Sequence, residues 1–120
     1  MSVSKQSYIP VVVEWVKRKG YDQIRANMEG FEAPIAYERQ NDDERFIPDV
    51  TGKQLFEQSY FEIILKGDRP DKIVSKLRLL SMLVSQKGGR LFLMTPPGNL
   101  NFAKELVTKY SINGEIVKIA

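Results

Sequence analysis

The sequence predicts an α/β fold with a central mixed β-sheet flanked by helices, in the order helix, three strands, helix, strand, helix, strand. Residues 10–19 and 70–86 carry apolar side chains at helical spacing, whereas residues 59–66 are rich in aromatic and β-branched side chains, as in a strand. With 120 residues, 42% of them hydrophobic, the chain can bury one core, so we expect a single domain over residues 1–120.

Three helices are predicted. The first covers residues 10–19 and ends at Gly20, and its apolar face consists of Ile9, Val12, Val13 and Val16. The second covers residues 70–86 before the stop at Gly88, and its expected buried stripe is Ile73, Leu77, Leu80 and Val84. The third runs from about residue 101 to residue 110, with three inward side chains, Phe102, Leu106 and Tyr110.

The strands follow from runs of apolar and β-branched residues between turn signals. Besides residues 59–66, strands are predicted at residues 22–28, 90–94 and 115–119. Residues 35–39 and 46–50 are candidate arms of a hairpin around the polar residues 41–43. The Thr-Gly-Lys segment at residues 51–53 is predicted to turn the chain toward the strand of residues 59–66.

Composition excludes several kinds of site. The chain has no histidine and no cysteine, which removes Ser-His-Asp and Cys-His catalysis and zinc sites built on thiolate or imidazole. Sites that bind a metal ion through oxygen ligands are still compatible with this composition. We find no signal-peptide pattern and no apolar run near the ~18 residues that span a bilayer, so we expect a cytoplasmic protein without a membrane segment.

Basic residues concentrate between residues 66 and 90. The net charge of +3 is compatible with nucleic acid binding but does not require it. Within this segment only Asp68 and Asp71 oppose the cations, which are Lys66, Arg69, Lys72, Lys76, Arg78, Lys87 and Arg90. Lys72 and Lys76, on the second helix, are the candidate contacts to nucleic acid phosphates.

Two acidic residues are the candidate metal ligands. Asp49 follows Pro48, and Glu62 stands in the run of strand-forming residues 60–65. Alternation of side chains can bring the two carboxylates to one point on neighbouring strands, where they would bind a hard cation such as Mg²⁺ or Mn²⁺. Such a cation can activate water against a phosphodiester.

The order of elements, with Pro48-Asp49 on one strand and Glu62 on the next, resembles the PD-(D/E)XK nuclease superfamily over residues 8–119. The resemblance implies a restriction-endonuclease-like fold, with Asp49 and Glu62 binding magnesium. It also implies a lysine two positions after the second acid, where this chain has Ile64. Lys66 is the predicted substitute, although its Cα lies about 13 Å from that of Glu62 along a strand. Lys53, Lys72 and Lys76 are alternatives, since some members of this superfamily place the lysine on the following helix.

Two functions follow as hypotheses. The first is a metal-dependent nuclease acting on DNA, with catalytic residues Asp49, Glu62 and Lys66. The second is a non-catalytic domain of the same fold that binds nucleic acid or a protein. A domain of this size offers little surface for holding a duplex, so we also expect a homodimer.

Overall fold

A five-stranded β-sheet with the order β1-β4-β5-β6-β7 forms the centre of the protein. The computed structural model describes residues 4–38 and 45–120. The strands of this sheet are β1 (Asp22–Ala26), β4 (Val50–Gln54), β5 (Glu57–Ile63), β6 (Leu91–Thr95) and β7 (Glu115–Lys118). The helices are the short 3-10 helix η1 (Lys5–Tyr8), α1 (Ile9–Arg18), α2 (Pro70–Lys87) and α3 (Leu100–Tyr110). Strands β2 (Tyr37–Glu38) and β3 (Arg45–Phe46) pair separately as a small second sheet.

The predicted mixed α/β sheet is confirmed. Strands β1, β4 and β5 are antiparallel, whereas β5, β6 and β7 are parallel. Parallel neighbours need a crossover connection, and α2 and α3 provide it after β5 and after β6. The sheet therefore changes from antiparallel to parallel pairing at β5, the strand that carries Glu62.

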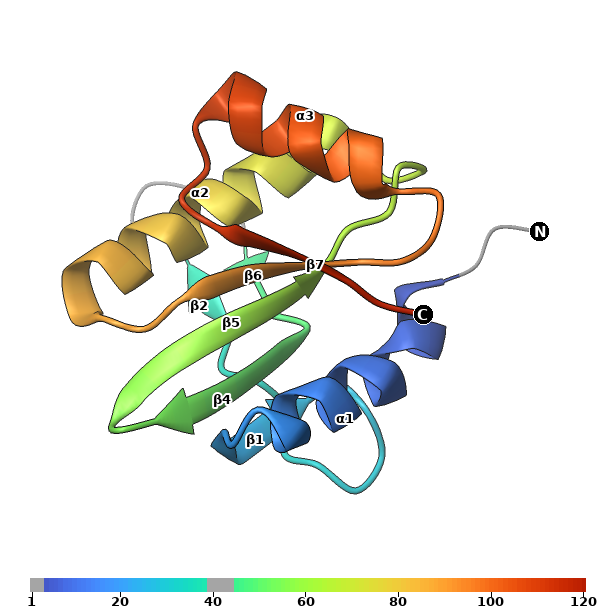
Figure 1. Ribbon diagram of the computed structural model, residues 1–120. Coiled ribbons are helices and arrows are strands. Elements are labelled where there is room, and N and C mark those ends of the chain that lie inside the picture. The colour runs from blue at the N-terminus through green and yellow to red at the C-terminus, as the bar shows by residue number, and fades with distance from the viewer. Residues whose placement is uncertain (1–3, 39–44) are drawn as a thin grey trace.

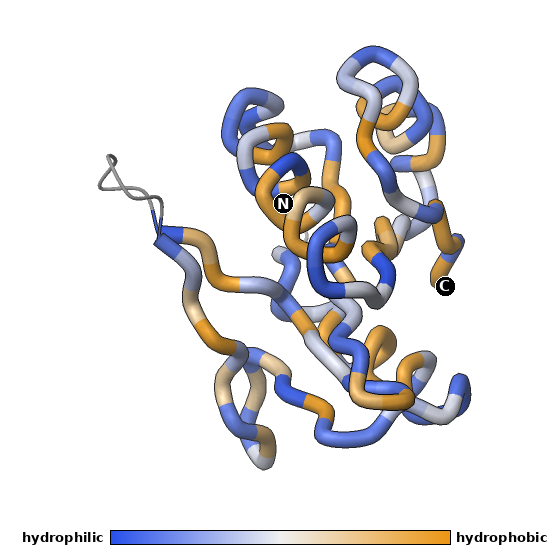
Figure 2. Tube along the Cα trace, turned by 90° about the vertical axis from the view of Figure 1, so that its left-hand side faces the viewer, coloured by the Kyte–Doolittle hydropathy of each residue, from blue (hydrophilic) through white to orange (hydrophobic). Residues whose placement is uncertain are grey.

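Helices cover both faces of the sheet. Helix α1 lies on one face, and α2 and α3 lie together on the other (Figure 1). Hydrophobic and hydrophilic residues alternate along the helical turns in Figure 2, as expected for helices with one buried side. Because side chains alternate along β5, Phe61 and Ile63 belong to the core beneath α1, and Tyr60 and Ile64 belong to the core beneath α2 and α3. Among the described residues, no helix has the length and apolar character needed to cross a membrane.

The turn predicted at residues 51–53 is wrong, because these residues lie inside β4. Gly52 is needed for close packing of this strand rather than for a turn. A Cβ atom at this position would lie 3.1 Å from Tyr21 Cβ and 3.3 Å from Val16 Cγ1. The chain reverses instead at Leu55 and Phe56, between β4 and β5, where the backbone φ angles are +52° and +70°.

The predicted hairpin of residues 35–39 and 46–50 is confirmed only in part, because the second strand is Arg45–Phe46 and so begins before the predicted arm. Tyr37 pairs with Phe46 and Glu38 with Arg45, but residue 50 belongs to β4 in the main sheet. The turn predicted at residues 41–43 lies outside the described residues. A contact between tyrosines joins this small sheet to the core, since the hydroxyl groups of Tyr37 and Tyr60 lie 2.8 Å apart.

Removing the Tyr60 hydroxyl is expected to cost about 1 kcal/mol of stability, the usual value for one partly buried hydrogen bond. Burial and the adjacent Tyr37 hydroxyl raise the pKa of Tyr60, so that it stays protonated and can donate. The measurement is urea denaturation of Tyr60→Phe. The matched control is Tyr8→Phe, since Tyr8 has no hydrogen bond from its hydroxyl within residues 4–38 and 45–120. Equal losses in the two variants would contradict the Tyr37–Tyr60 contact.

Candidate functional site

Asp49 and Glu62 lie side by side at one end of the β4–β5 pair. Val50 pairs with Phe61 in the antiparallel register, so the preceding residue on one strand faces the following residue on the other. The backbone N–H of Asp49 donates to Glu62 Oε2 at 2.7 Å, and the N–H of Ile63 donates to Asp49 Oδ2 at 2.8 Å. The structure therefore brings together the two acids predicted from the sequence.

Lys76 reaches both carboxylates from α2. Its Nζ lies 2.7 Å from Glu62 Oε1 and 3.7 Å from Asp49 Oδ1. Lys76 stands one helical turn from Ile73 and from Leu80, on the side of α2 that packs on the sheet, and its side chain is only 17% exposed. The packing of α2 on the sheet thus places an ammonium group over two buried acids.

Lys5 is a second cation at the site, and it was not among the residues predicted from the sequence. Its Nζ lies 3.3 Å from Asp49 Oδ2, although the two residues are 44 positions apart in the chain. Lys5 begins η1, which continues directly into α1, so the packing of α1 on the sheet carries Lys5 to the site. No local motif marks this residue, because its role depends wholly on the tertiary fold.

The other predicted lysines lie outside this cluster. Lys66 is exposed, and its backbone N–H donates to Asn99 Oδ1 at 2.9 Å. Lys72 is exposed on α2, and Lys53 lies near the far end of β4. In the part of the chain that the structure describes, none of these three forms an ion pair with Asp49 or Glu62. Binding of nucleic acid by Lys72 and Lys76 stays a prediction.

Ile64 stands where the resemblance implies a lysine. Ile64 directly follows the last residue of β5, is 2% exposed and packs in the core beneath α2. A lysine here would have to bury its stem among Val74 and Leu77. The ammonium group near the acids comes from α2 instead.

Burial and charge set the protonation of the site. Burial, together with the charge of Asp49, raises the pKa of Glu62 to about 7 against the opposing effect of Lys76. Burial also opposes ionisation of Asp49, but the charges of Lys76 and Lys5 and the N–H of Ile63 outweigh it and lower the Asp49 pKa. Burial disfavours the charged form of Lys76, yet the two carboxylates raise its pKa. Near pH 7, Asp49 is therefore ionised and Lys76 is charged, whereas Glu62 is divided between its protonated and ionised forms.

Asp49 and Glu62 supply carboxylate oxygens, which are the donor type that a hard divalent cation takes, but these oxygens already face N–H or ammonium groups. Glu62 Oε1 is buried and accepts no hydrogen bond of regular geometry from the described residues, although the Lys76 ammonium neutralises it. Mg²⁺ is usually held by one or two carboxylates with several waters, and this is what Asp49 and Glu62 offer. Within the described residues there is no cluster of three or more metal-ligating side chains, so a closed protein cage is not available there.

Comparison with known proteins adds no relative, since no family model, curated protein or solved structure matches this chain.

Proposed function

We propose that this protein is a Mg²⁺- or Mn²⁺-dependent nuclease that hydrolyses phosphodiester bonds of nucleic acid. The contact of Lys76 with both Asp49 and Glu62 is the observation that carries the proposal. Two acids on neighbouring strands and a lysine beside them are the groups that the PD-(D/E)XK resemblance requires. The order of helices and strands around a mixed sheet also supports a restriction-endonuclease-like fold.

Each side chain then has a defined task. Asp49 and Glu62 would hold the ion, which supplies activation of water and neutralisation of charge on the phosphate. Lys76 acts in place of the lysine missing at residue 64. Because the neighbouring carboxylates raise its pKa, Lys76 holds its proton at Nζ near neutral pH. Its role is therefore to orient the attacking water or to stabilise negative charge on phosphate oxygens, rather than to remove a proton.

A second candidate is a non-catalytic nucleic-acid-binding domain of the same fold. One observation favours it: two lysines, Lys5 and Lys76, already pair with the two acids. A cation entering the site must compete with these ammonium groups. Calorimetric titration with Mn²⁺ separates the candidates, because uptake that depends on Glu62 favours the nuclease.

Cleavage of nicked, branched and single-stranded DNA in Mn²⁺ tests the nuclease directly. Asp49→Asn is expected to lower the rate by on the order of 100-fold or more, since it removes a charged ligand and the main charge partner of Lys5. Asp71→Asn, an exposed acid on α2, is the matched control and should cleave like the wild type. Equal rates for wild type and Asp49→Asn would remove the proposed site, and metal-independent DNA binding without cleavage would favour the second candidate.

A further inference from the structure

The turn between β4 and β5 presents two bulky apolar side chains to solvent. Leu55 is 86% exposed and Phe56 is 101% exposed, the two highest values among the large hydrophobic side chains that the structure describes. In Figure 1 this hairpin end lies at the lower left, far from both chain ends. The two residues have no place in the core, so burial within this chain does not explain their apolar character.

The backbone makes the pair still more unusual. Both residues adopt positive φ, +52° at Leu55 and +70° at Phe56, in a two-residue hairpin turn. Such turns favour Asn-Gly or Asp-Gly, because a bulky side chain is disfavoured at positive φ. Leucine and phenylalanine therefore cost stability here and gain no buried contact in return. A strained backbone that carries exposed apolar side chains points to a function at the turn.

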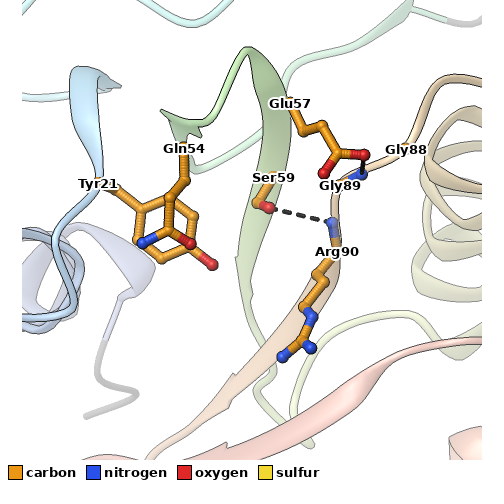
Figure 3. A pocket seen from close by; sticks show the side chains of 7 residues that line it. All are labelled: Tyr21, Gln54, Glu57, Ser59, Gly88, Gly89 and Arg90. Atoms are coloured by element: carbon orange, nitrogen blue, oxygen red, sulfur yellow. Dashed lines mark hydrogen bonds between the residues drawn. The ribbon is translucent and has the colours of Figure 1, made fainter.

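The surface beside the turn is polar. A hollow of about 390 Å³ opens next to it, lined in part by Gln54, Glu57, Ser59 and Arg90 (Figure 3). Glu57 accepts a hydrogen bond from the N–H of Gly89, and Ser59 Oγ accepts one from the N–H of Arg90. Amide, hydroxyl and charged groups beside the apolar tip suit a partner that combines flat apolar faces with polar edges, and they do not suit lipid tails.

Three lysines have their backbone near the turn, and the ammonium group of one of them, Lys19, lies over the Trp15 ring. Lys53 lies two residues before Leu55, and the Lys19 carbonyl accepts a hydrogen bond from Gln54, the residue that precedes the turn. Lys87 immediately precedes Gly88, whose backbone lies against the Glu57 side chain. Over residues 4–38 and 45–120, none of these lysines forms an ion pair. Two acids lie as near, Glu57 directly after Phe56 and Asp22 opposite Lys53 on β1, so the three lysines leave a positive balance of charge, which favours a polyanion as the partner.

We propose that Leu55 and Phe56 form a wedge that stacks against the bases of nucleic acid where the bases are unpaired or distorted. Apolar side chains that enter base steps, flanked by cations that contact phosphates, are a known way of binding deformed DNA. The turn lies about 20 Å from Asp49 along β4, or roughly six base-pair steps. One DNA molecule can therefore reach both. The proposal takes its partner from the proposed function, but it does not require cleavage.

The double variant Leu55→Asn/Phe56→Gly tests the wedge, because it removes both apolar side chains and installs a favoured turn. It should therefore unfold at the same temperature as the wild type or above it. The probe is a duplex with a two-nucleotide bulge that contains 2-aminopurine, titrated in EDTA so that cleavage cannot contribute. Wild type should bind the bulged duplex more tightly than the matched duplex and change the 2-aminopurine fluorescence. The variant should lose at least about 10-fold of that preference and leave the fluorescence unchanged.

Three outcomes would overturn the wedge. The first is equal preference and equal fluorescence change in wild type and variant. The second is that sedimentation finds a dimer for the wild type and a monomer for the variant, while both bind the bulged duplex equally well. The third is that the protein binds anionic lipid vesicles only when Phe56 is present, whereas its binding to the bulged duplex does not depend on Phe56. Failure of the proposed function is a separate result, since it would appear as absence of cleavage in Mn²⁺ whatever the variant does in EDTA.

Discussion

Replacement of Lys76 by methionine is expected to lower the free energy of unfolding by about 3–5 kcal/mol at pH 8, the usual cost of leaving a buried charge without its partner. Methionine keeps much of the length of the side chain but removes the ammonium group that lies 2.7 Å from Glu62 Oε1. Asp49 and Glu62 would then face each other with only Lys5 to neutralise them. Urea denaturation at pH 8 measures the loss.

The loss should shrink as the pH falls, because Glu62 can bind a proton and relieve the repulsion. At pH 5 the difference between Lys76→Met and wild type is therefore expected to be well below its value at pH 8. Lys72 is an exposed lysine on the same helix, so Lys72→Met is the control. It should change the free energy of unfolding by no more than about 0.5 kcal/mol at either pH. A loss below about 1 kcal/mol at pH 8 in Lys76→Met would contradict the ion pairs of the structure.

Of the two strands that carry the acids, β5 could be predicted because its signals are local, whereas β4 covers residues that were predicted as a turn. Residues 59–66 combine aromatic and β-branched side chains, and β5 covers most of this segment. Once β4 and β5 pair as an antiparallel hairpin, the positions of Asp49 and Glu62 follow from the register alone. The sequence contained no signal for the turn itself, since Leu55 and Phe56 are not turn-forming residues. Gly52 is a residue type that is common in turns, but it lies inside β4.

The lysines could not be ranked from the sequence, because their positions depend on how the helices pack. Spacing along a strand already placed Lys66 far from Glu62, but nothing local distinguished Lys72 from Lys76. Val74, Leu77 and Leu80 bury one side of α2, and this rotation brings Lys76 over the acids and leaves Lys72 in solvent. Lys5 depends on the packing of α1 in the same way.

Glu62 should make the protein less stable as the pH rises from about 5 to 8. Its pKa is about 7 in the folded protein against an ordinary value of 4.5, so the folded state binds more protons than the unfolded state in this window. The free energy of unfolding therefore falls with rising pH, by up to about 3 kcal/mol once Glu62 is fully ionised. Asp49 acts in the opposite direction, because its pKa is lowered, and it loses its contribution only as the pH falls below about 4.

Glu62→Gln isolates this effect, because glutamine cannot titrate but can still accept the N–H of Asp49. Between pH 5 and 8 the stability of this variant should be nearly flat where that of the wild type declines. Glu105→Gln, at an exposed position on α3, should keep the wild-type slope. Parallel curves for wild type and Glu62→Gln would show that Glu62 does not titrate in this range.

The same titration links stability to the proposed metal. A cation binds the ionised form of Glu62, so Mn²⁺ should stabilise the wild type more at pH 8 than at pH 5 and thereby offset the decline. Thermal unfolding with and without Mn²⁺ at the two pH values measures this difference. Glu62→Gln should show a small and pH-independent response. A response in wild type that is equally small at both pH values would leave the cluster as an internal ion-pair network and favour the non-catalytic candidate.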